Sequence, residues 1–199
     1  MRRLIATALL ALLARPAAAQ VTVDFTPKAG VYVPVEHFSD AGVITRHQTQ
    51  FEIGGRLGLW LSPSLGLEGT LDYSEPSINT VVNGVNVGSV PANIFAASLR
   101  PTVKLSSRNG VTALVLSAGG GIVSQGGQFA AGLRGKTDLA PAAGIGLLVR
   151  LTRVVDARFD VDGYTYTPTL TDVTGAAITG RRQYDLFIAF GLRGQFGRF

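Results

Sequence analysis

The sequence contains no cysteine, and charged residues make up only 16% of its 199 residues. Without cysteine, a disulfide scaffold, a cysteine-ligated metal or cluster and a lipid-anchored form are all excluded. Low charge combined with 46% hydrophobic residues also excludes a disordered chain. After residue 19 no apolar run is long enough for a transmembrane helix, so any membrane insertion must use strands.

The net charge of +5 is a weak indication of nucleic-acid binding. Three of the 18 basic residues, Arg2, Arg3 and Arg15, lie in the first nineteen positions. The rest of the chain holds 15 basic and 13 acidic residues, a charge of +2. We therefore expect no nucleic-acid partner.

The first nineteen residues have the three parts of a secretory signal peptide. A cationic start, Met1–Arg3, precedes the apolar run Leu4–Ala14 and the small residues Ala17–Ala19. The sequence predicts cleavage between Ala19 and Gln20, with residues 1–19 as signal peptide and residues 20–199 as one domain that works outside the cytoplasm. An alternative interpretation is a buried N-terminal helix.

From Val23 onward, apolar residues recur with a period of two, which is typical of strands. Turn-forming clusters divide the chain into eight segments of ten to fourteen residues, alternately joined by short turns and long polar loops. Such long strands favour an all-β, eight-stranded antiparallel up-and-down transmembrane β-barrel, which leaves no sheet edge. The predicted strands are 23–35, 48–61, 65–74, 93–105, 111–123, 138–151, 155–167 and 183–196.

Alternation leaves two barrels open, a soluble lipocalin-like one with its charges outside and a membrane one with its charges in the lumen. Small residues on the charged face would make room for long charged side chains in a narrow lumen. Aromatic residues of the apolar face gather near strand ends, as Phe25, Phe51 and Tyr184 do, which indicates girdles at two membrane interfaces. Both features favour the membrane barrel.

The charged side chains of this barrel are expected to pair with one another, because a buried unpaired charge is costly. The network then forms a structural plug, or alternatively lines a narrow polar conduit. An eight-stranded interior is only just wide enough for side chains, which favours the plug. The expected lumen charges are Asp24, Lys28, Glu52, Arg56, Glu68, Asp72, Arg100, Lys104, Arg150, Asp156, Arg158, Asp160, Asp162, Asp185 and Arg193.

With its signal peptide, alternating segments, long loops and aromatic C-terminus, the chain resembles the small outer-membrane β-barrel proteins of OmpA, OmpX and OmpW type. The resemblance implies an outer-membrane location, both termini in the periplasm, contact with outer-membrane lipid and recognition of Phe196 or Phe199 by the barrel-assembly machinery. Only Phe196 is in phase with the apolar residues before it, so either Gly197 breaks the register or Phe196 closes the barrel. A monomer is expected.

No catalytic or metal-binding constellation stands out. Asp160-Val-Asp162-Gly163 resembles the start of a calcium loop, but lacks the further ligands and flanking helices of such a site. The segment His37-Phe-Ser39-Asp40 holds the residue types of a catalytic triad, yet triads are normally assembled from distant segments. We expect no enzyme activity and no cofactor.

Four prolines, Pro27, Pro34, Pro101 and Pro141, lie inside predicted strands, where a missing N–H predicts bulges or a lumen water. Of the four, Pro101 and Pro141 are the positions at which a misplaced strand boundary would show first. The sequence identifies no ligand. A structural or surface-interaction role through the long loops is the first hypothesis. A narrow channel or a passage for small apolar molecules is the second, and a lipid-modifying enzyme the third.

Overall fold

The computed structural model describes residues 21–35, 38–40, 43–82, 85–128, 130–131, 137–171, 177–179 and 182–198. All regular secondary structure in these residues is β-strand. No helix in the described residues has the length and hydropathy to span a bilayer.

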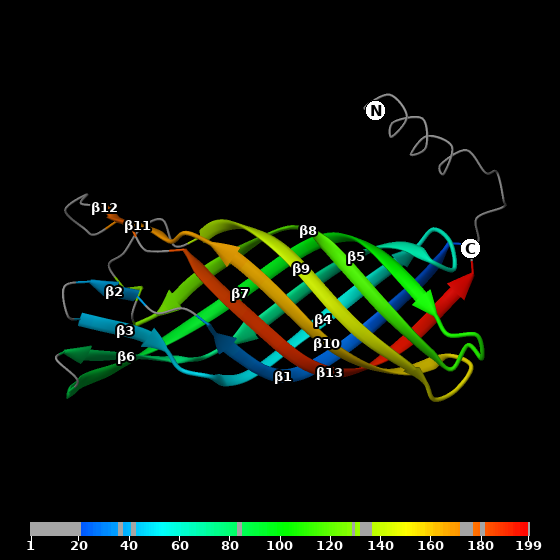
Figure 1. Ribbon diagram of the computed structural model, residues 1–199, viewed down its shortest axis with the longest axis horizontal. Coiled ribbons are helices and arrows are strands. Elements are labelled where there is room, and N and C mark those ends of the chain that lie inside the picture. The colour runs from blue at the N-terminus through cyan, green and yellow to red at the C-terminus, as the bar shows by residue number, and fades with distance from the viewer. Residues whose placement is uncertain are drawn as a thin grey trace, which may run out of the picture.

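Eight antiparallel strands close into a barrel, as predicted (Figure 1). The order around the barrel is β7-β5-β4-β1-β13-β10-β9-β8, and pairing of β8 with β7 completes it. Because every barrel strand has two neighbours, the barrel itself presents no free edge. The strands are β1 (Thr22–Pro34), β4 (Gln50–Trp60), β5 (Leu65–Ser74), β7 (Val85–Ser106), β8 (Thr112–Gly127), β9 (Thr137–Arg150), β10 (Val155–Tyr166) and β13 (Gln183–Arg198).

Short strands extend the barrel at the end opposite its tight turns (Figure 1). The extension contains β2 (Phe38–Asp40), β3 (Val43–His47) and β6 (Ser77–Val82). These strands lie side by side in the order β2-β3-β6, and β6 pairs with the first part of β7. Strands β11 (Thr169–Thr171) and β12 (Ala177–Thr179) form a separate hairpin. The sequence predicted loops here, which was wrong for these stretches, because each of these short strands pairs with a neighbouring strand.

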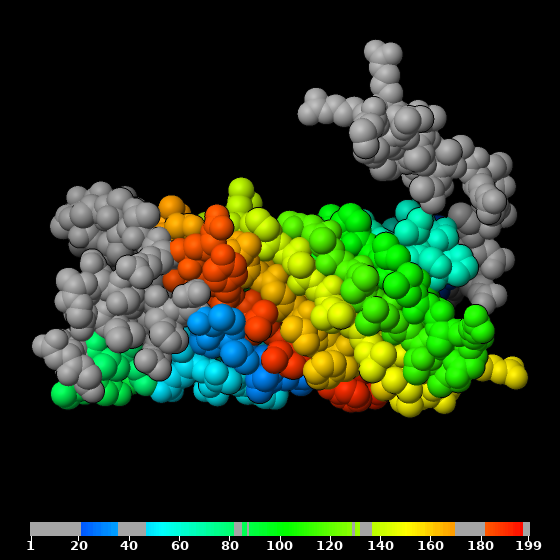
Figure 2. Space-filling view, viewed as in Figure 1, coloured from blue at the N-terminus to red at the C-terminus, as the bar shows by residue number. Residues whose placement is uncertain are grey.

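The wall of the barrel has a polar inner face and an apolar outer face. In β10, buried and more exposed residues alternate throughout, and the buried ones include Asp156, Arg158, Asp160 and Asp162. On the side seen in Figure 2, the side chains of β13, β10 and β9 adjoin one another without an opening. The charged face therefore lies inside, as the small residues of that face had indicated.

Prolines within the strands lie where the ladder of paired residues is interrupted. Pro27 pairs with Gly55 but has no partner in β13. Pro101 is likewise unpaired on the β8 side, and the pairing of β9 with β10 ends before Pro141. A proline lacks the N–H that such a pair would need. Pro101 and Pro141 both lie well inside their strands, so neither marks a misplaced strand boundary.

The C-terminal strand contains a bulge beside the predicted assembly signal. Val23 of β1 pairs with Phe196, whereas Thr22 pairs with Arg198, so the register skips Gly197. Phe196 lies on the outer face with 59% of its surface exposed. Phe199 lies outside the described residues, as do Ala19 and Gln20 of the predicted cleavage site.

Candidate functional site

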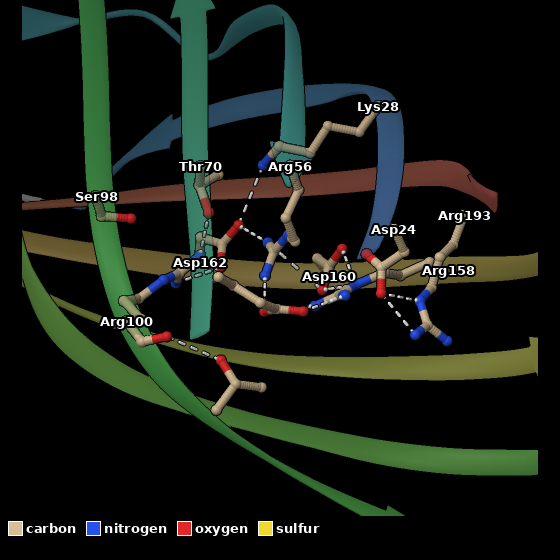
Figure 3. Close-up of polar contacts among 12 residues, drawn as sticks. Asp24, Lys28, Arg56, Thr70, Ser98, Arg100, Arg158, Asp160, Asp162 and Arg193 are labelled. Atoms are coloured by element: carbon tan, nitrogen blue, oxygen red, sulfur yellow. Dashed lines mark hydrogen bonds and ion pairs between the residues drawn. The ribbon is translucent and has the colours of Figure 1, made fainter. Parts of the chain in front are cut away.

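The middle of the lumen is filled by four basic and four acidic side chains from five strands. Figure 3 shows the four bases together with Asp160 and Asp162. None of the eight has more than 3% of its side chain exposed. Equal numbers of each sign make this layer formally neutral, which limits the cost of placing charges away from bulk water. The eight are Lys28, Arg56, Glu68, Asp72, Arg100, Arg158, Asp160 and Asp162.

Asp162 is the acceptor for three basic side chains from three other strands. Arg100 donates through Nη1 to Oδ1 at 2.6 Å, and Arg56 donates through Nη2 to Oδ2 at 2.6 Å. Lys28 Nζ lies 3.1 Å from Oδ2 and 2.6 Å from Asp72 Oδ1. Charge-assisted bonds of this length are among the strongest in proteins. Asp162 therefore ties β10 to β1, β4 and β7 across the barrel.

Arg158 forms the second centre of the network. Its Nη1 donates to Glu68 Oε1 at 2.6 Å and its Nη2 to Glu68 Oε2 at 3.1 Å. Its Nε lies 2.9 Å from both carboxylate oxygens of Asp160, and Arg56 Nη1 also donates to Glu68 at 2.9 Å. The forked Arg158–Glu68 contact fixes both position and angle, which a lysine could not do.

Glycines on the inner face make room for these carboxylates. A Cβ added to Gly58, Gly144 or Gly146 would lie 2.5 Å from an Oδ1 atom, of Asp24, Asp162 and Asp160 respectively. A contact that short requires the network to shift. The inner glycines are thus part of the site, as their position on the charged face had suggested.

A second polar layer closes the lumen toward the tight turns. Arg193 donates through Nε and Nη2 to Asp24 Oδ2, at 2.8 and 2.6 Å, and through Nη1 to Asp156 at 2.7 Å. The indole N–H of Trp60 also donates to Asp24, and Lys104 Nζ lies 4.5 Å from the centre of the Trp60 ring. Trp60, the only tryptophan in the chain, is 3% exposed.

The opposite half of the lumen is filled by aromatic and aliphatic side chains. Tyr32 and Tyr166 donate to the two oxygens of Asp185 at 3.0 and 2.8 Å, and the Phe187 ring packs between Tyr32 and Tyr164. These residues belong to a buried cluster that also includes Ile94, Ala96, Val123, Ala140 and Ala142. The lumen is therefore occupied at three successive levels.

The structure does not place all the predicted lumen charges in one network. Arg150 lies at the mouth with 55% of its side chain exposed, 3.9 Å from Asp156. Glu52 is fully buried, but its two oxygens have no hydrogen-bond partner among the described residues. Asp185 interacts with tyrosines rather than with a base. Tyr164 and Tyr166 were not among the predicted site residues, although they share the face of Asp160 and Asp162 and could have been found from that.

The structure describes the calcium-like motif but not the side chains of the triad-like segment. No group of three or more histidine or acidic side chains in this part of the chain could hold a metal ion. Asp160 and Asp162, the start of the calcium-like motif, are engaged by arginines. His37 lies outside the described residues, and of the side chains of Ser39 and Asp40 nothing is described.

His47 is buried at the junction between the barrel and its extension. It is 5% exposed and its ring lies 6.3 Å from that of Tyr32, edge to face. Burial lowers the pKa of the His47 imidazole from 6.5 to about 4. The side chain is therefore neutral at pH 7.

The outer face of the barrel carries a belt of large apolar side chains that no protein surface covers. Leu57, Leu71, Leu99 and Phe190 each have 55–57% of their surface exposed. Aromatic residues border the belt, Phe51 and Tyr184 toward the extension and Phe196 toward the tight turns. A continuous belt of exposed apolar side chains is unsuited to water and matches the hydrocarbon core of a bilayer.

Comparison with solved structures finds the same fold in small outer-membrane barrels. The outer membrane protein OprG from Pseudomonas aeruginosa superposes with a TM-score of 0.66 at 10% identity, over 90% of this chain and 97% of that one. The outer membrane protein AlkL, studied in DMPC lipid bilayers, gives 0.56 at 14% identity, over 92% and 94%. Neisserial surface protein A gives 0.53 at 12% identity, over 89% and 97%.

No family model and no curated protein matches the sequence. At identities this low, the likeness to OprG, AlkL and Neisserial surface protein A shows the fold alone.

Proposed function

We propose that the protein is an outer-membrane barrel that acts as a closed membrane anchor and presents the β2–β3–β6–β7 extension outside the cell. Its role is then structural or one of surface interaction. The observation that carries this proposal is the filled lumen. The central ion pairs lie between the polar layer that contains Trp60 and the buried aromatic cluster that contains Tyr32.

A conducting path would need a continuous water-filled space, whereas buried, ion-paired side chains occupy the central layer. Opening it would separate several charge-assisted contacts at once, including Arg158–Glu68 and Arg100–Asp162. Each separation leaves a buried charge without its partner, which is strongly unfavourable. The geometry therefore supports an anchor over a constitutive channel.

The proposal includes the biogenesis and surroundings of such a barrel. Its N-terminal segment directs export, Phe196 is read by the barrel-assembly machinery, outer-membrane lipid surrounds the apolar belt, and the barrel is a monomer. The side of the extension is extracellular, because the barrel's tight turns and C-terminal strand end lie together at the other end (Figure 1).

Electrical recording in a planar bilayer tests the anchor. The refolded protein is expected to insert without producing conductance steps, while the variant Arg56→Ala/Arg158→Ala, if it folds, opens a measurable path. Regular steps from the unaltered protein, with a selectivity changed by Arg56→Ala, would instead establish the narrow channel.

Electrically silent transport of small apolar molecules is a separate alternative. Vesicles that contain the protein and an internal apolar-sensitive dye distinguish it. The anchor predicts the same uptake rate with and without protein, and protein-dependent uptake would overturn it.

A further inference from the structure

An apolar groove of about 1090 Å³ crosses the outer surface of the barrel over β4, β5, β7, β8 and β9. Leu57, Leu71, Leu99 and Ile122 form its walls, and Gly69 and Gly120 lie in its floor. Arg56 borders the groove through its backbone alone, because its side chain is 1% exposed and turned into the lumen. The space is therefore on the outer face and separate from the ion-pair network.

The groove results from alternation of large and small residues in neighbouring strands. One row of paired residues runs Leu57, Gly69, Leu99, Gly120 across β4, β5, β7 and β8. The adjacent row runs Gly55, Leu71, Ala97, Ile122 across the same strands. Each large side chain thus lies beside a small one, both along its own strand and across to the neighbouring strands. The outer surface is therefore uneven, with hollows over the small residues.

The chain's own packing does not require glycine in the groove floor. A Cβ placed on Gly69 or Gly120 would meet no atom within 4 Å. This contrasts with Gly58 and Gly144 of the inner face, where a Cβ would lie 2.5 Å from a carboxylate oxygen. Glycine weakens a strand interior and adds no apolar surface toward lipid. The open space at Gly69 and Gly120 is accordingly available to a molecule outside the barrel.

A ledge of polar and aromatic residues borders the groove on the side of the extension. Tyr73, Phe95, Ser124 and Thr137 form one row of paired residues across β5, β7, β8 and β9. The exposed Thr137 hydroxyl donates to Ser124 Oγ at 3.0 Å, and the exposed Tyr73 hydroxyl donates to Glu75 at 2.8 Å. Hydroxyls and aromatic rings at this level are suited to the headgroup region of a bilayer.

We propose that this groove is a binding site for a membrane lipid of the extracellular leaflet, whose acyl chains lie over Gly69 and Gly120 and whose headgroup contacts the Tyr73–Thr137 ledge. The inference rests on the proposed membrane location. The groove is continuous with the apolar belt that faces lipid, and its lining is predominantly apolar, with few groups to which a peptide backbone could hydrogen-bond. An amphipathic occupant is indicated because the apolar groove and the polar ledge adjoin.

Filling the groove from within the protein tests the site. In Gly69→Leu/Gly120→Leu, the new side chains enter open space, so the barrel is expected to fold normally. The matched control is Gly163→Leu on the outer face of β10, outside the groove, where a Cβ meets its nearest atom, Leu186 Cδ2, at 3.4 Å. Each protein is reconstituted with a phosphatidylcholine or, separately, with lipopolysaccharide, extracted in mild detergent and examined by native mass spectrometry.

The unaltered protein and Gly163→Leu are expected to retain lipid, with at least tenfold weaker retention by the double variant. Equal retention by all three proteins, or none by any, would overturn the lipid site. A change from dimer to monomer in the double variant, without a loss of lipid, would assign the groove to a second copy of the chain and also overturn it. If cell fractionation and gel mobility show that the protein does not insert into membranes, the proposed function itself is refuted.

Discussion

Removal of the Arg158 guanidinium is expected to destabilise the barrel severely. Arg158 supplies two bonds to Glu68 and one Nε–H shared by both oxygens of Asp160. In Arg158→Ala, Glu68 keeps only Arg56 Nη1 at 2.9 Å, and the nearest remaining base to Asp160 is Arg56 Nη2 at 3.6 Å. Removing one partner of a buried ion pair costs about 3–5 kcal/mol. That is a large part of the roughly 5–15 kcal/mol that stabilises a typical domain.

Urea unfolding from lipid vesicles, followed by tryptophan fluorescence, measures this loss. Trp60 is the only tryptophan and lies inside the lumen, so its emission reports opening of the barrel. The control is Arg108→Ala in the turn between β7 and β8, where an exposed side chain is expected to contribute less than about 0.5 kcal/mol.

A double-variant cycle separates the loss of an ion pair from a general loss of packing. Glu68→Leu removes the other partner, and Arg158→Ala/Glu68→Leu removes both. If the buried charge left alone causes the damage, the double variant should unfold at a higher urea concentration than the sum of the two single effects predicts. Simple additivity, or an Arg158→Ala cost no larger than that of Arg108→Ala, would refute the reasoning.

Two further predictions concern a lumen glycine and the buried histidine. Gly58→Ala places a Cβ against Asp24 and is expected to lower the free energy of unfolding by about 1–3 kcal/mol. The control is Gly88→Ala, where a Cβ meets nothing within 4 Å and stability should change little. The two variants are compared by the yield of folded protein in the gel-shift assay. Since the pKa of His47 is about 4 when folded and near 6.5 when unfolded, its neutral form stabilises the extension above pH 6.5, and this stability falls as the pH decreases toward 4. Hydrogen exchange of the β3 and β6 amides should show that the free energy of local opening falls by on the order of 3 kcal/mol. Protection factors, corrected for the intrinsic exchange rate, that stay constant from pH 7 to 4.5 would contradict this prediction.

The barrel could be predicted because each strand carries its own signal. In β10, the alternation of Arg158, Asp160 and Asp162 with apolar residues indicates both the strand and its charged face. The fold then follows from the number of such segments and from the need to remove sheet edges.

The partners within the lumen could not be predicted. Arg56 and Asp162 are 106 residues apart, and their contact depends on the register of several intervening strands. The same limitation explains why Asp185 was expected to pair with a base. In the structure, the hydroxyls of Tyr32 and Tyr166 donate to its carboxylate instead. Strands β3 and β6 were missed because they are short and pair with each other although 29 or more residues separate them in the sequence, a pairing that no local pattern indicates.

The most direct test of the account is the electrophoretic mobility of the mature protein in SDS, with and without boiling, after expression in a Gram-negative host. The charged lumen and apolar exterior predict an SDS-resistant barrel in the outer-membrane fraction, with a band that shifts on boiling. A soluble periplasmic protein whose mobility is unchanged by boiling would contradict the central claim that the charged face lies inside a membrane barrel.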